Sequence, residues 1–322
     1  MVHDDMTRTV SIIMYHYIRD CYSGPDHADL KVKGRSSEEF RFQLRFFKKH
    51  FNPITMADLL LAVKDTTYKL PPKAVLLTFD DGYLDHWQTA MPLLLEENIQ
   101  GSFFPVGSVA TRREILDVNK IHFILAAQPD QQRIIKDIFL HIDKSREAYD
   151  LPDEATLTAA YKGHAHRFDN PDVGFIKYAL QRGLPQKLRN EICTSLFERY
   201  VTNDVHGFAD SLYMNEKQLR DLHSHNMFVG GHGWMHMWLD TLSASEQQHE
   251  VEMTADFLRT LAVPAETWVM AYPYGAFNGT TRNILGARGW AAGLSTQAGI
   301  ADLSVHDRFM LPRLDTNDFP IS

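Results

Sequence analysis

Short apolar runs alternate with longer stretches of helical pattern, and this alternation limits the possible folds of the chain more than any other feature. Residues 10–17, 74–79 and 101–106 have the length and composition of buried strands. Ser36 and Thr55 each begin a helix-like stretch between the first two runs. Strands and helices that alternate in this way form parallel sheets with crossover helices. The sequence therefore predicts an α/β fold.

The middle of the chain has a different pattern. Residues 111–212 are polar and mostly helical in pattern, with few β-branched runs, and the α/β alternation resumes at residue 213. We interpret residues 1–110 and 213–322 as the two parts of one α/β barrel. Residues 111–212 would then be a helical insertion, which we expect on the side of the catalytic loops, where it would wall a cleft.

The composition narrows the class of protein. Hydrophobic residues make up 44% of the chain and charged residues 23%, as in an ordinary globular protein. The net charge of −8 argues against binding to nucleic acid or to an anionic membrane. Two cysteines, Cys21 and Cys193, are too few for a disulfide framework. With an acidic N-terminus and no apolar run of about 18 residues, we expect a cytoplasmic protein that does not insert into membranes.

Two adjacent carboxylates follow the second predicted strand. Asp80 and Asp81 belong to the segment Thr78-Phe-Asp-Asp-Gly82. In parallel α/β folds, active sites form at the carboxyl ends of the strands. Two ionised carboxylates repel each other, so we expect a cation beside them. Taken alone, Asp-Asp-Gly is equally typical of a solvated turn.

Two histidines follow a later apolar run. His232 and His236 lie four residues apart in Gly-Gly-His-Gly-Trp-Met-His, and both could face one metal ion if the segment were a helical turn. In a chain with 16 histidines, the pair alone is a weak signal. Together with one of the two carboxylates, the pair gives a ligand set that leaves a coordination position open for water on a zinc-type ion.

A third segment, Ala271-Tyr-Pro-Tyr-Gly275, ends another predicted strand. Its proline and glycine favour a rigid loop whose backbone N–H groups could face a reacting carbonyl. A tight turn selected for its shape alone is the alternative.

In this order, Thr78-Phe-Asp-Asp-Gly, His232-x-x-x-His236 and Tyr272-Pro-Tyr-Gly resemble the motifs of the polysaccharide deacetylase (NodB-homology) family, carbohydrate esterase family four. The resemblance covers residues 10–110 and 213–315, about two thirds of the chain, and includes Phe103-Phe-Pro-Val-Gly. It implies a distorted (β/α) barrel of about seven strands. It also implies metal-dependent removal of an acetyl group from an amino sugar.

The resemblance implies a role for each motif residue. Asp81, His232 and His236 would hold one divalent ion, zinc in the first place, with nickel, cobalt and manganese as alternatives. Asp80 would be the general base, and the backbone N–H of Tyr274 would stabilise the oxyanion.

Two positions depart from the family pattern. Ala271 stands where many members have an arginine that steadies the base, and Leu-Pro-Arg313 stands where they have a Leu-x-His that supplies the acid. In a subgroup related to the deacetylases of exported poly-N-acetylglucosamine, the acid histidine lies on the first strand, as His16 does here. We therefore expect His16 to be the general acid, with a hydrogen-bonded core histidine as the alternative. We expect Arg313 to steady Asp80.

The expected substrate is an acetamido sugar. A walled cleft suits a small or end-bound molecule, so we expect a cytosolic nucleotide- or lipid-linked precursor of a surface glycan. Aromatic rings stack on sugars or simply pack, and those that flank the motifs are Tyr83, Trp234, Trp238 and Tyr272. Two alternatives remain. One is a deacylase for another group (O-acetyl, N-formyl) or for a non-sugar amide such as a ureide, and the other is a catalytically silent glycan-binding protein.

Overall fold

A computed structural model describes residues 7–20, 22–24, 27–30, 32, 34–163 and 169–322. Cys21 and the acidic residues 1–6 lie outside the described residues. Within them, seven parallel strands run in the order β7-β6-β5-β1-β11-β9-β8. Their bounds are β1 (Thr9–Tyr15), β5 (Ala74–Asp81), β6 (Gly101–Pro105), β7 (Phe228–Val229), β8 (Val269–Ala271), β9 (Ala292–Ala298) and β11 (Leu311–Asp315). The predicted α/β class is confirmed.

The two ends of this strand order meet. Gly231, just after β7, forms a parallel bridge with Met270 of β8. The N–H of Gly231 donates to the carbonyl of Val269 at 3.0 Å, and the N–H of Ala271 donates to the carbonyl of Gly231 at 2.9 Å. The sheet therefore curls into a distorted barrel, in which β7 and β8 are only two and three residues long.

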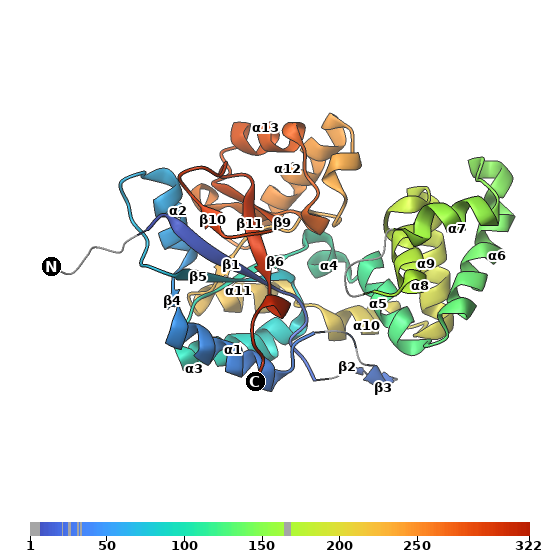
Figure 1. Ribbon diagram of the computed structural model, residues 1–322, viewed down its shortest axis with the longest axis horizontal. Coiled ribbons are helices and arrows are strands. Elements are labelled where there is room, and N and C mark those ends of the chain that lie inside the picture. The colour runs from blue at the N-terminus through green and yellow to red at the C-terminus, as the bar shows by residue number, and fades with distance from the viewer. Residues whose placement is uncertain (1–6, 21, 25–26, 31, 33, 164–168) are drawn as a thin grey trace. The chain divides into compact units, whose positions relative to one another are not determined.

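Helices surround the strands, with α1 and α3 on one side and α12 and α13 on another (Figure 1). Their bounds are α1 (Ser37–His50), α2 (Met56–Lys64), α3 (Met91–Glu97), α4 (Gly107–Arg112), α11 (Glu216–Ser224), α12 (Ala244–Thr260) and α13 (Gly279–Ala287). A capping box begins α1: the Ser36 side chain accepts from the N–H of Glu39, whose carboxylate accepts from the N–H of Ser36. Phe40, Leu44 and Phe47, spaced along one helical face, are buried.

Shorter elements complete the description. They are β2 (Tyr22–Gly24), β3 (His27–Leu30), β4 (Asn52–Pro53), β10 (Ala301–Asp302), η1 (His86–Ala90), η2 (Ala179–Gly183), η3 (Leu239–Thr241), η4 (Ala265–Thr267), η5 (Pro273–Gly275) and η6 (Thr316–Asp318). Among the helices of the described chain, none has both the length and the apolar character needed to cross a bilayer.

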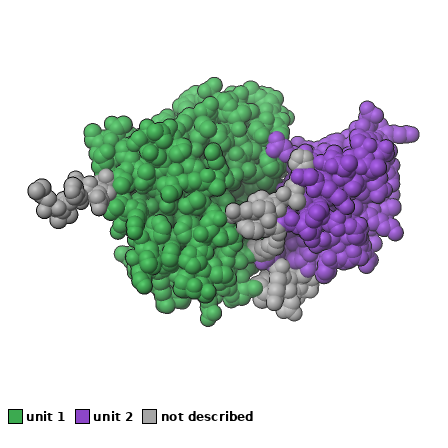
Figure 2. Space-filling model, in the orientation of Figure 1, with its two compact units in different colours: residues 1–20, 33–113, 210–322 green, residues 21–32, 114–209 purple. Residues whose placement is uncertain are grey.

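The chain divides into two compact units, which Figure 2 colours separately. Unit 1 comprises residues 1–20, 33–113 and 210–322, and it contains the barrel and every candidate site residue. Unit 2 comprises residues 21–32 and 114–209. The segment 21–32 therefore clusters with unit 2, whereas the sequence analysis assigned it to the barrel.

Unit 2 is mainly helical and has its own aromatic packing. Phe208 lies edge-on to Phe123 and Phe197, with ring centroids 4.9 and 5.1 Å apart. Its helices are α5 (Asp117–Ala127), α6 (Gln131–Tyr149), α7 (Glu154–Lys162), α8 (Pro171–Tyr178) and α9 (Gln186–Tyr200), and α10 (Val205–Leu212) leads back to unit 1.

Candidate metal centre and active site

The two adjacent carboxylates lie where β5 leaves the barrel. All eight residues of β5 are buried, so Asp80 and Asp81 are held at the end of a rigid strand. The chain then turns through Asp81 and Gly82, whose φ angles are 73° and 75°. A Cβ on Gly82 would lie 2.8 Å from Cβ of Pro105, so only glycine fits this turn.

Asp81, His232 and His236 come together as the resemblance implies. One potential ligand atom from each residue lies within 4.8 Å of the others. Oδ1 of Asp81 is 3.3 Å from Nε2 of His232 and 3.4 Å from Nε2 of His236. The three residues are 4%, 2% and 8% exposed, so bulk water does not solvate the cluster freely.

The contacts around this cluster fit a divalent cation. Nδ1 of His232 lies 2.7 Å from the carbonyl of Ala271, which can only accept, so Nδ1 carries a proton. In the neutral ring, Nε2 then presents a lone pair toward Asp81. Oδ1 of Asp81 is buried, and across the described residues no hydrogen bond of good geometry reaches it. Lone pairs that converge in this way suit a zinc-type ion bound by two imidazoles and a carboxylate.

The other oxygen of Asp81 is held by Tyr83. The Tyr83 hydroxyl donates to Oδ2 at 2.5 Å. This bond fixes the plane of the carboxylate and leaves Oδ1 toward the histidines.

The segment from His232 to His236 is a loop, which corrects the helical turn considered above. Gly233 has φ 74° and His236 has φ 55°, both in the left-handed region. These two residues bend the chain so that the imidazole rings lie 4.9 Å apart. A left-handed conformation costs a non-glycine residue about 1–2 kcal/mol, so surrounding contacts must hold His236 in place.

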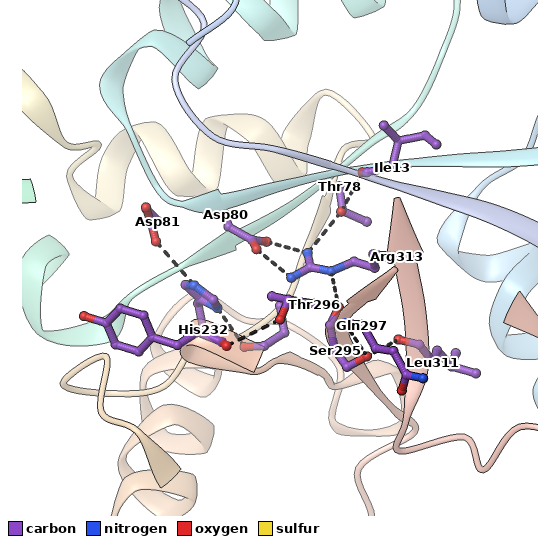
Figure 3. Close-up of polar contacts among 12 residues, drawn as sticks. Ile13, Thr78, Asp80, Asp81, His232, Ser295, Thr296, Gln297, Leu311 and Arg313 are labelled. Carbon is purple, nitrogen blue, oxygen red and sulfur yellow. Dashed lines mark hydrogen bonds and ion pairs between the residues drawn. The ribbon is translucent and has the colours of Figure 1, made fainter. Parts of the chain in front are cut away.

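Arg313, on β11, faces both oxygens of Asp80 (Figure 3). Its Nη1 donates to Oδ1 at 2.9 Å and its Nη2 to Oδ2 at 2.7 Å. Nε donates to the carbonyl of Ser295 at 2.9 Å, and Nη1 also lies 3.2 Å from Oγ1 of Thr78. The guanidinium is thus fixed on several sides in a fully buried position, beside the residue that it was expected to steady.

Both aspartates are ionised at neutral pH. Burial alone would raise the pKa of Asp80, but the charge of Arg313, followed by that of His232, holds it below the usual range. Burial likewise acts to raise the pKa of Asp81, but His232 and His236, when they are protonated, hold this pKa well below the usual range. A charged Asp81 can bind a cation, and a charged Asp80 can accept a proton.

His16 lies at the same edge of the barrel, just after β1, and is partly buried. A positive charge at this position would be the smallest of the several causes that lower the pKa of Asp80 and of Asp81. The backbone carbonyl of His16 accepts a hydrogen bond from Nε2 of the buried His86 at 2.7 Å. The sequence analysis missed His86, because a buried histidine that bonds a backbone carbonyl leaves no motif.

Tyr274 and Trp238 form a stacked pair beside the metal ligands. Their ring centroids are 4.2 Å apart with planes 4° from parallel, and the Tyr274 ring lies 4.6 Å from that of His236. Tyr274 has φ 57° and is held in the turn after β8. Trp238 is partly exposed, so its position remains compatible with contact to a ligand.

The other aromatic residues require a correction. Tyr83 and Tyr272 are fully buried, so neither ring presents a face on which a sugar could stack. The Tyr272 hydroxyl donates to the carbonyl of Phe309 at 2.8 Å, and its ring packs on Phe277. Trp234 is 9% exposed and belongs to the hydrophobic core.

Solved structures with a similar fold span nearly the whole chain. The chain is similar to the Streptococcus pyogenes deacetylase PplD in complex with acetate (16% identity, TM-score 0.57, 95% of this chain and 92% of that chain). It is also similar to the BpsB deacetylase domain from Bordetella bronchiseptica (16%, 0.54, 97% and 96%) and to IcaB from Ammonifex degensii (16%, 0.55, 96% and 91%). At these identities the similarity establishes the fold alone.

The sequence has no match among curated proteins. It does match the family model described as polysaccharide deacetylase, over residues 67–140 and 186–292. The matched residues are more than half of the chain, and they contain both metal-ligand motifs and the Tyr272-Pro-Tyr-Gly turn. This chain therefore belongs to the polysaccharide deacetylase family.

Proposed function

We propose that this protein is a metal-dependent hydrolase that removes the N-acetyl group from an acetamido sugar. The observation that carries the proposal is the grouping of Asp81, His232 and His236 around Oδ1 of Asp81. This oxygen is buried, and within the described residues no well-formed hydrogen bond reaches it. A second carboxylate, Asp80, lies next in the chain and is kept charged by Arg313. The family makes an acetylated sugar the natural substrate class.

A divalent ion in this site supplies Lewis acidity toward an acetyl carbonyl and toward water. Asp80 acts as general base and takes a proton from the attacking water. The fork of Arg313 keeps that carboxylate charged and fixes its orientation before the proton arrives.

The remaining steps concern the oxyanion and the leaving group. The backbone N–H of Tyr274 donates to the tetrahedral oxyanion, a contact typically worth about 3–4 kcal/mol. His16 gives a proton to the departing amine, which is otherwise a very poor leaving group. Because the alcohol of an ester leaves more readily than the amine of an amide, O-deacetylation at the same site would depend less on His16.

The sequence predicts that the sugar is linked to a cytosolic nucleotide or lipid carrier. Acetate release is therefore measured on N-acetylglucosamine in free, UDP-linked and lipid-linked form. O-acetyl analogues in the same series, and N-formyl analogues assayed for formate release, test the alternative acyl groups.

The metal dependence is tested by elemental analysis beside these assays. We expect about one divalent ion per chain, with loss of both the ion and the activity in Asp81→Ala and His232→Ala. His223→Ala, which removes an imidazole outside the site, should retain both. Acetate release by Asp81→Ala at the wild-type rate would refute the proposal.

A further inference from the structure

The loop between the two metal-ligating histidines is bonded to a buried carboxylate. Glu250 of α12 is 6% exposed. Its Oε2 accepts hydrogen bonds from the backbone N–H groups of Trp234 and Met235, each at 3.0 Å. The side chains of Gly233, Trp234 and Met235 contain no oxygen, so none of these side chains can accept the two N–H groups in place of Glu250.

The carbonyl groups of the same loop are held from another element. The N–H of Gly107, the first residue of α4, donates to the carbonyl of Gly233 at 3.2 Å. The N–H of Ser108 donates to the carbonyl of Trp234 at 2.9 Å. The N–H groups of Trp234 and Met235 and the carbonyl groups of Gly233 and Trp234 are therefore bonded to other elements, and Glu250 is the side chain that accepts the two N–H groups.

This arrangement explains how the strained conformation persists. Gly233 and His236 have positive φ angles, and a Cβ on Gly233 would lie 3.1 Å from Cγ of Pro273. If Glu250 no longer accepted the N–H groups of Trp234 and Met235, the backbone of His236 would relax toward ordinary φ and ψ angles. Its imidazole would then move away from Asp81, 3.4 Å distant in the structure.

We propose that Glu250 is a positioning residue for the metal centre. By accepting both loop N–H groups, it keeps Nε2 of His232 and Nε2 of His236 at the separation that one ion requires. The inference rests on the proposed function in that the cluster binds a metal, but it does not depend on the identity of the substrate.

Zinc affinity provides the test, because it needs no substrate. Wild type, Glu250→Ala and Glu250→Gln are titrated with Zn²⁺ against a chelator, and their Co²⁺ absorption spectra are compared. We expect Glu250→Ala to bind zinc about 10–100-fold more weakly and to give an altered cobalt spectrum. Glu250→Gln should retain most of the affinity, because the amide oxygen can accept both N–H groups.

Leu258→Ala is the matched control. Leu258 is a fully buried residue on the same helix, two turns beyond Glu250. Its truncation should lower the thermal midpoint without weakening zinc binding. If Glu250→Ala showed the same pattern, a fall in thermal midpoint with unchanged zinc affinity, Glu250 would be a structural residue and the proposal would be overturned.

Two further outcomes separate the proposals. If Glu250→Ala does not fold, Glu250→Asp takes its place. This variant keeps the charge but moves the carboxylate away from the two loop N–H groups. Weaker zinc binding by Glu250→Asp would support the inference, and unchanged binding would overturn it. Wild-type protein that takes up zinc but releases no acetate would overturn only the sugar deacetylase, whereas protein that takes up no zinc would overturn both.

Discussion

At the scale of single residues, Arg313 and Asp80 show how a buried ion pair depends on its geometry. Both side chains are almost completely buried and meet through two parallel hydrogen bonds. Removing one partner leaves the other as an uncompensated charge in the interior. The pair therefore links the stability of the barrel to the protonation state of the proposed base.

Arg313→Ala should destabilise the protein by about 3–5 kcal/mol, because Asp80 would remain buried without its partner. Urea unfolding at neutral pH measures this loss. Arg313→Lys keeps the charge but not the planar fork, so its acetate release should fall even where the fold survives. Arg308→Ala, at an exposed arginine, is the control; an equal loss there would show that the buried pair contributes nothing special.

His16 is the residue whose role depends most on the substrate. If it protonates the leaving amine, His16→Ala should lower kcat/KM for an acetamido sugar by about 10²–10⁴-fold. The loss with 4-nitrophenyl acetate should be far smaller, since that leaving group departs without a proton. His223→Ala should change neither rate, and equal losses on both substrates in His16→Ala would identify His16 as a structural residue.

The grouping of Asp81, His232 and His236 was predictable, because binding of an ion would dictate residue types as well as spacing. Two of the 16 histidines, His232 and His236, could be picked out together with Asp81 by their motifs. Aromatic residues carry no such constraint, because a tyrosine fits a hydrophobic core and a binding surface equally well. Only the burial of Tyr83 and Tyr272 in the structure assigns them to the core. Glu250 escaped notice because its partners are backbone N–H groups, which are present in nearly every residue.

At the scale of elements, α2 offers a test of capping. The Thr55 side chain accepts from the N–H of Asp58 at 3.2 Å, and Asp58 accepts from the N–H of Thr55 at 2.8 Å. The Tyr68 hydroxyl also donates to Asp58, at 3.0 Å. Burial acts to raise the pKa of Asp58, but its bonds to Thr55 and Tyr68 prevail and the pKa is lowered.

A carboxyl whose pKa is lowered by folding stabilises the protein above its unfolded pKa, about 3.9. That contribution is lost as the pH falls through the folded value. Asp58→Ala should therefore cost about 1 kcal/mol at pH 7, and its difference from wild type should shrink below about pH 4. Urea unfolding at both pH values measures this. Glu266→Ala, at an exposed carboxylate, should cost little at either, and a constant cost for Asp58→Ala would contradict the argument.

Local patterns revealed the elements better than the connections between them. The apolar runs became β1, β5 and β6, and Ser36 and Thr55 cap the helices that they were expected to begin. The loop from His232 to His236 was missed because its conformation is held by α4 and α12, which lie outside the segment. Backbone angles imposed from outside a segment leave no trace in its own composition.

At the scale of the whole molecule, the proposed metal ligands come from distant parts of the chain that meet only after folding. An ion that binds the folded state alone stabilises it by about 2.7 kcal/mol at a concentration 100 times its Kd. For a chain of 322 residues, zinc should therefore raise the thermal midpoint by about 4 °C, measured by calorimetry. Mg²⁺, which prefers oxygen ligands, should have little effect, and an equal zinc shift in His232→Ala would locate the ion elsewhere.

Neither the strand order nor the assignment of residues 21–32 to unit 2 could be read from the sequence, because both depend on contacts between distant segments. The insertion was predicted from a change of pattern. Its expected place beside the cleft stays a prediction.

The borders of unit 2 have one further consequence. Arg113 and Asp210, the last residue of unit 1 before the long segment and the first after it, are joined by an ion pair on the surface, with Nε 2.6 Å from Oδ1. The chain thus leaves and re-enters the barrel unit at neighbouring points. A linker of three or four residues spans roughly 10–14 Å, so such a linker could take the place of residues 114–209 without changing where the chain of the barrel unit breaks off and resumes.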